Sequence, residues 1–258
     1  LLALLVSVSA LAQKTYIQCG NLIDTRNQKV LKDMTIVVEG NKIVEVKNGL
    51  QKGEKTDIVI DLSKKFVMPG LIDMHVHIES QTAKDQFQKR IQYSEADVAF
   101  ESQKYAKITL MAGFTTVREL GDNHQISTAL KKAIAKGYVT GPRIFAAGKS
   151  IATTGGHADP TNGVAAALMA DPGPKEGVIN GADDARKAVR QRYKEGSDLI
   201  KITATGGVLS VAKSGSNPQF TAEELTAIVS TANDYGMKVA VHAHGKEGME
   251  RAIKAGVH

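Results

Sequence analysis

The pattern of apolar and polar residues changes once along the chain. From Lys14 to about Val67, short apolar and β-branched runs alternate with turn residues, which predicts strands joined by hairpins. The clearest of these runs are residues 35–38, 42–46 and 58–60. We therefore expect residues 13–67 to form a small N-terminal β domain.

After Pro69-Gly70 the pattern becomes one of apolar strands separated by helical stretches, which is typical of parallel βα units. Strands are predicted at 71–76, 115–118, 143–147, 199–203 and 238–243, and helices at 97–111, 126–136, 182–195 and 221–235. The last helix begins with a capping box, Thr221 and Glu224, and ends at Gly236.

About five βα units, with a sixth strand starting at Val257, predict an α/β fold for residues 68–258. A closed TIM-type (β/α)8 barrel takes about 250 residues, so we expect this barrel to be incomplete at its C-terminal side. A doubly wound sheet is the alternative. No glycine-rich dinucleotide fingerprint follows the first strand, and this favours the barrel.

Composition narrows the class of protein. With 42% hydrophobic and 23% charged residues and a net charge of +6, the chain is not intrinsically disordered. The lysines are scattered and aromatic residues make up only 5%, which argues against nucleic acid as a partner. The single cysteine, Cys19, excludes an intrachain disulfide framework and a cysteine-based zinc site, and we expect it to be a small buried hydrophobe.

Both ends of the sequence suggest truncation. Residues 1–12 are uncharged and end in Ala-Leu-Ala before Gln13, the pattern of a signal-peptidase site; a buried N-terminal strand is the alternative. Twelve residues are too short to span a membrane. We therefore expect a signal-peptide remnant and a periplasmic or secreted protein with no stable membrane span after cleavage. The last residues, 255–258, follow a helix-like segment and start another strand.

Two H-x-H pairs each end an apolar strand. Residues two apart on a strand share a face, so His75 and His77 point one way, as do His242 and His244. Converging neutral imidazoles at the end of a strand indicate a metal site, with hydrogen-bonded core histidines as the alternative. The apolar residues that alternate with these histidines along the two strands are expected to pack under the helices: Ile72, Met74, Val76, Val239 and Val241.

Lys201 lies on a predicted strand whose neighbours Ile200 and Ile202 should face the helices, which places the lysine inside. An unpaired ammonium there is costly. Either the amine pairs with an inward acid such as Asp73 or Glu119, or it loses its proton and reacts with CO2 to form a carbamate that bridges two divalent ions.

As an ordered set, five segments resemble the metal-dependent amidohydrolase superfamily: PGLIDMHVH, GFTTVREL, GPRIFAAGKSIATTGGH, DLIKITATGG and VAVHAHG. Within it they are similar to the imidazolonepropionase-related group that includes Xaa-Pro dipeptidases (prolidases) and metallo-carboxypeptidases. The resemblance covers residues 20–258. It implies that His75, His77, carboxylated Lys201 and His242 bind two divalent ions, expected to be zinc, and that the N-terminal domain is a composite β-sandwich completed from the C-terminus. A sixth-strand His and an eighth-strand Asp would lie beyond His258.

Other polar residues have weaker assignments. His157 follows the third strand in a glycine-rich loop and is a candidate substrate-binding residue, with an exposed loop histidine as the alternative. Arg118 could anchor a substrate carboxylate or pair with Glu119. His244 is expected to lie just behind the ligands and to contact substrate, and His124 to be a surface residue at a helix start.

The resulting hypothesis is an enzyme that hydrolyses an amide bond, with a dipeptide as the small-molecule substrate and a metal-bridging hydroxide as the nucleophile. The first alternative is an imidazolonepropionase-like cyclic-amide hydrolase. The alternative of another class is a catalytically inactive half-barrel, because residues 1–258 would lack part of the metal site. The sequence does not distinguish a monomer from a homo-oligomer.

Overall fold

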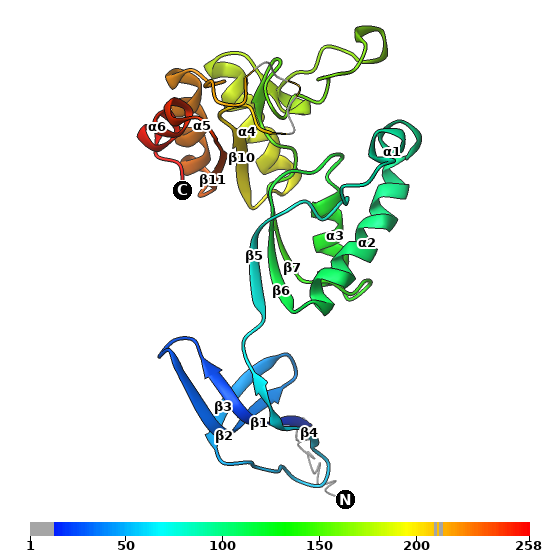
Figure 1. Cartoon of the computed structure of the whole chain (residues 1–258), viewed down its shortest axis with the longest axis vertical. Coiled ribbons are helices and arrows are strands. Elements are labelled where there is room, and N and C mark those ends of the chain that lie inside the picture. Colours follow the sequence, from blue (N-terminus) through cyan, green and yellow to red (C-terminus); the bar gives the residue numbers. More distant parts are fainter. Residues whose placement is uncertain (1–12, 209–210, 212–213) are drawn as a thin grey trace, which may run out of the picture. The chain divides into compact units, whose positions relative to one another are not determined.

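The computed structural model describes residues 13–208, 211 and 214–258. The expected signal-peptide remnant, residues 1–12, lies outside this part. The chain divides into two compact units after Gly70 (Figure 1). None of the helices among the described residues has the length and apolar character needed to cross a membrane.

The first unit is a four-stranded mixed sheet in the order β3-β2-β1-β4. Strand β1 is antiparallel to β2 and parallel to β4. Its core contains Cys19, which is fully buried as expected, and burial raises the pKa of its thiol. This is the one sheet among the described residues of the unit, so a sandwich stays a prediction. The bounds are Lys14–Asp24 (β1), Lys29–Glu39 (β2), Lys42–Asn48 (β3) and Ile58–Val67 (β4).

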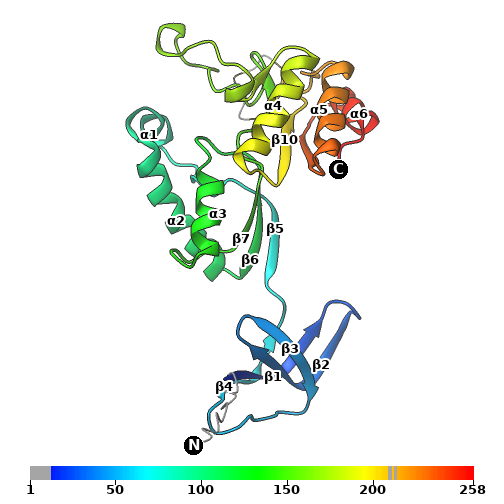
Figure 2. The same ribbon diagram turned by 180° about the vertical axis from the view of Figure 1, so that it is seen from behind.

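The second unit begins with a parallel sheet in the order β5-β6-β7. Helices α2 and α3 lie together on one side of this sheet in both views (Figures 1 and 2). Val117, Leu130 and Ile144 are buried between them. The elements are Leu71–Val76 (β5), Gln86–Gln92 (α1), Glu95–Met111 (α2), Phe114–Glu119 (β6), Ile126–Ala135 (α3) and Arg143–Ala146 (β7).

The rest of the second unit is built on the parallel pair β10 and β11. Ile200, Ile202 and Val239 pack in one core with residues of α4 and α5. A backbone hydrogen bond of 2.7 Å from Asp198 N to Ala146 O joins this part to β7. The elements are Ala152–Thr153 (β8), Val178–Ile179 (β9, paired with β8), Ala182–Glu195 (α4), Leu199–Thr203 (β10), Ala222–Asp234 (α5), Lys238–His242 (β11) and Lys246–Ala255 (α6), with 3-10 turns at Ala166–Leu168 and Pro174–Glu176.

The parallel α/β class is confirmed, and the predicted elements are present with small shifts at their ends. Helix α2 starts at Glu95 and not at 97, because Ser94 caps it and Asp97 completes a capping box. The capping box of Thr221 and Glu224 is confirmed. Helix α1 and the short strands β8 and β9 were not predicted.

Two expectations need correction. Ile72 and Met74, expected under the helices, are 60% and 53% exposed, whereas Val76 of the same face packs on the core of α2 and α3. No strand is formed at Val257, although His258 N donates to Val239 O at 2.9 Å, as a residue entering a strand beside β11 would.

Candidate active site

The first H-x-H pair lies at the C-terminal end of β5. Val76 and Ile78 pack into the core of α2 and α3, so alternation turns His75 and His77 to the opposite face. Their ring centroids are 5.4 Å apart at an interplanar angle of 65°. The predicted shared orientation of the two imidazoles is therefore confirmed.

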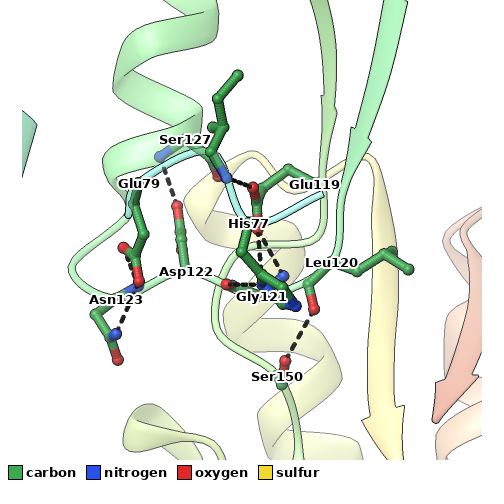
Figure 3. A network of polar contacts seen from close by, with 10 residues as sticks. His77, Glu79, Glu119, Leu120, Gly121, Asp122, Asn123, Ser127 and Ser150 are labelled. Carbon is green, nitrogen blue, oxygen red and sulfur yellow. Dashed lines mark hydrogen bonds and ion pairs between the residues drawn. The ribbon is translucent and has the colours of Figure 1, made fainter. Parts of the chain in front are cut away.

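The backbone of the β6–α3 loop fixes the ring of His77. Its Nδ1 lies 2.9 Å from the carbonyl oxygen of Gly121 (Figure 3). A carbonyl only accepts, so Nδ1 carries the proton and Nε2 of the neutral ring keeps a free lone pair. A second-sphere carbonyl that sets the tautomer in this way is typical of metal-binding histidines.

A buried acidic network supports this loop (Figure 3). Glu119 is fully buried and accepts hydrogen bonds from the backbone N–H groups of Ile78 and Gly121, and its Oε1 is 3.5 Å from His77 Nδ1. Burial raises the pKa of Glu119 and Asp122 and raises the pKa of Glu79 to about 7. The bond to Glu119 in turn raises the pKa of His77.

The rest of this network connects the end of β5 to the start of α3. Glu79 accepts from the backbone and side-chain nitrogens of Asn123 at 2.9 and 3.0 Å, and Asp122 accepts from Ser127 N. Sequence reasoning named Glu119 only as a partner for Lys201 or Arg118, and it missed Glu79 and Asp122. The available signal was their position directly after the two strands, in the segments HIES and RELGDN.

Lys201 lies on the face of β10 opposite its helix-packed neighbours, as predicted, and is only 4% exposed. Burial, followed by the charge of Arg118, lowers the pKa of its amine to about 8, and the charge of Glu119 opposes this shift. Among the described residues, Lys201 forms no ion pair with Asp73 or Glu119 within salt-bridge distance. The alternative of a paired ammonium is therefore not supported.

The second H-x-H pair joins the same region. His242 is in register with Thr203 on β10, and Val239 and Val241 pack with α4 and α5 as predicted. The His242 ring stacks on His157 at 4.3 Å and 21° and meets the His244 ring edge-on at 4.9 Å. His242 Nε2 lies 2.9 Å from Gly206 O, which leaves Nδ1 of the neutral ring as the free acceptor.

Gly207 allows the stacked pair His157–His242 to form. A Cβ on this glycine would come within 2.8 Å of His242 Nε2 and 2.9 Å of His157 Cε1. The tertiary structure thus brings the loop residue His157 into the site, and its buried Nδ1 has no hydrogen-bond partner among the described residues. Burial lowers the pKa of both rings.

Two further residues named from the sequence, Arg118 and His124, contact the protein's own backbone or side chains. Arg118 Nε donates to Met74 O at 2.7 Å, next to the irregular β5–β6 register between Asp73 and Val76, so in this structure it ties the two strands together. The expected pair with Glu119 is not observed among the described residues. His124 is a surface residue whose Nδ1 lies 2.8 Å from Glu95 Oε1.

The donor set fits divalent metal ions in its chemistry. The positive charge of Lys201 is among the causes that lower the pKa of three rings, His75, His157 and His242, and it opposes the rise in the pKa of His77. Within residues 13–258, apart from those the structure does not describe, no three His, Cys, Asp or Glu side chains form a ready ion site.

The fold and the site define an α/β protein with imidazoles and a buried amine on its parallel strands, which is a candidate metal-dependent enzyme. Residues 66–258 match the amidohydrolase family, and the chain belongs to that family. Proteins of this superfamily are generally metal-dependent.

Solved structures and a curated relative agree with this assignment. A crystal structure of a Xaa-Pro dipeptidase with methionine in its active site is 53% identical, with a TM-score of 0.90, over 95% of this chain and 60% of that one. A prolidase complexed with N-methylphosphonate-L-proline is 32% identical, with a TM-score of 0.85 and the same coverage. Ochratoxinase of Aspergillus niger is 29% identical over 88% of this chain and 48% of its own length. The chain thus spans about half to three fifths of these proteins.

Proposed function

We propose that the full-length protein is a metal-dependent amidohydrolase that cleaves dipeptides, Xaa-Pro among them. The observation that carries this proposal is the buried Lys201 together with histidines from the end of β5, from β11 and from the loop after β8. We also propose that the βα units belong to a TIM-type barrel, as in amidohydrolases. The similarity to the Xaa-Pro dipeptidase and the prolidase supports both proposals.

In this proposal His75, His77, Lys201 and His242 hold two divalent ions, for which zinc suits the imidazole ligands. Bound there, the ions would lower the pKa of a water molecule and polarise the scissile carbonyl. The hydrogen bond from His77 Nδ1 to Gly121 O already orients the His77 ring and leaves Nε2 free to bind an ion. His242 can bind through Nδ1, or through Nε2 if it leaves Gly206 O.

The carbamate on Lys201 forms from CO2 and the neutral amine. The nitrogen lone pair attacks the carbon, one C=O π bond becomes a C–O⁻, and the amine releases one proton to solvent. Burial favours the neutral amine, since it lowers the pKa to about 8. The product is an anionic carbamate, whose two oxygens replace the positively charged ammonium form of the lysine.

We propose that the substrate lies against His157, with His244 and Arg118 as further substrate-binding residues. His157 is best supported, because its unpartnered Nδ1 is buried next to His242. Arg118 already donates through Nε to Met74 O, so any contact with a substrate carboxylate would use its other nitrogens.

A substrate panel tests this function. We expect the full-length protein with zinc and bicarbonate to hydrolyse Xaa-Pro and other dipeptides faster than imidazolone propionate, measured by release of the free amino acid and by loss of the ring absorbance. Ring opening without dipeptide turnover would replace the proposal with the cyclic-amide alternative.

Residues 1–258 should be assayed beside the full-length protein, because the described part contains no complete ion site and exposes Ile72 and Met74. We expect this piece to be inactive. Turnover by the piece at full-length levels would show that the cluster needs no further ligands.

We also propose export, on the basis of the Ala-x-Ala pattern that ends at residue 12. N-terminal sequencing of the protein from the extracytoplasmic fraction is expected to begin at Gln13. A mature protein that still starts with the apolar segment, or one found only in the cytoplasm, would contradict it.

A further inference from the structure

Thr203 has a buried hydroxyl that the packing of the protein does not explain. The residue is 3% exposed, and its Oγ1 has no hydrogen-bond partner among the described residues. A buried hydroxyl without a partner is unfavourable, and valine has nearly the same shape without it. A position selected only for packing would favour valine.

The backbone fixes the direction in which this side chain points. Thr203 N donates to Ile151 O and Ala204 N donates to His242 O, so the strand end is held from both sides. Ile200 and Ile202 face α4 and α5, which turns Lys201 and Thr203 to the opposite face. Across the ladder, Thr203 is in register with His242 and Lys201 with Ala240.

Thr203 is therefore a neighbour of two of the residues assigned to the metal site. It is one inward position beyond Lys201 along β10 and directly opposite His242 on β11. Inward positions of one strand are about 6.6 Å apart, a span that a carboxylated lysine can bridge because strand side chains lean along the strand. Opposite Lys201, the small residue Ala240 packs with Leu120, Ala147 and Leu199.

We propose that Thr203 is a positioning residue whose hydroxyl donates a hydrogen bond to a carbamate oxygen of carboxylated Lys201. The inference rests on the proposed carboxylation of Lys201. The hydroxyl then has its partner only in the carboxylated protein, where it orients the oxygens toward the ions. In the uncarboxylated protein it contributes nothing to stability.

The test compares Thr203→Val, which keeps the shape and removes the donor, with Thr203→Ser, which keeps the donor. In full-length protein freed of metal and CO2, we expect the Tm of Thr203→Val to equal or exceed that of wild type, by up to about 2–4 °C. With zinc and ¹³C-bicarbonate, the same variant should need about tenfold or more bicarbonate for a half-maximal carbamate NMR signal, since hydrogen bonds to charged groups are the stronger kind. Thr203→Ser should stay near wild type.

Ser197→Ala is the matched control. Ser197 also has a buried Oγ without a partner among the described residues, but it precedes the opposite end of β10. Its replacement should leave the bicarbonate requirement unchanged. Thr203→Ala is a second variant without the hydroxyl in case valine does not fit.

The outcomes separate the two proposals. An unchanged bicarbonate requirement in either soluble hydroxyl-free variant, with a carbamate signal in wild type, would overturn the role of Thr203 and leave the proposed function standing. No carbamate signal in wild-type protein that still hydrolyses dipeptides would overturn carboxylation, and the role of Thr203 with it.

Discussion

Lys201→Ala in the full-length protein is expected to release the metal ions and to abolish dipeptide hydrolysis. The lysine is buried on β10, and its charge lowers the pKa of His75, His157 and His242. Losing a second-sphere partner alone typically costs about 10–100-fold in metal affinity or activity, so loss of a bridging ligand should cost more than about 100-fold. Metal content by elemental analysis and turnover of a dipeptide measure the effect.

Chemical rescue makes this prediction specific. Short carboxylic acids supply two oxygens in the space of the missing side chain, and we expect them to restore part of the metal binding to Lys201→Ala. Lys238→Ala is the control, because Lys238 is exposed at the opposite end of the adjacent strand β11. Two bound ions and normal turnover in Lys201→Ala would refute the assigned role.

Glu119→Ala is expected to destabilise the protein by about 2–5 kcal/mol. The substitution leaves the N–H groups of Ile78 and Gly121 without their acceptor, and each buried unsatisfied donor costs about 1–3 kcal/mol. It also removes the acid beside His77 Nδ1 and opens a cavity next to the β6–α3 loop. Urea unfolding followed by circular dichroism measures the change in the free energy of unfolding.

Glu101→Ala is the surface counterpart. Glu101 on α2 accepts from Lys89 of α1 and from Tyr105 of α2 and is partly exposed, so its loss should change the free energy of unfolding by less than about 1 kcal/mol. Equal stability losses in the two variants would mean that Glu119 does not hold the ends of β5 and β6 together. Loss of metal affinity in Glu119→Ala that exceeds its loss of stability would show that His77 depends on this acid.

Sequence by itself determined the parallel α/β class, most helices and strands, and the inward side chains of the site. Strands alternate with a period of two, so the apolar neighbours of His75, Lys201 and His242 were enough to show which way each points. Capping boxes are equally local, and the box at Thr221 was readable without a structure.

Only the tertiary structure decided which distant residues meet. Glu119 reaches Ile78 and His77, more than forty positions away, and His157 stacks on His242, which comes from another βα unit. The close approach of Gly207 and the unpartnered hydroxyl of Thr203 likewise depend on what surrounds them. Burial changes the pKa of Glu79 and Lys201 for the same reason: it is a property of the packed chain, and residue order alone contains no measure of it.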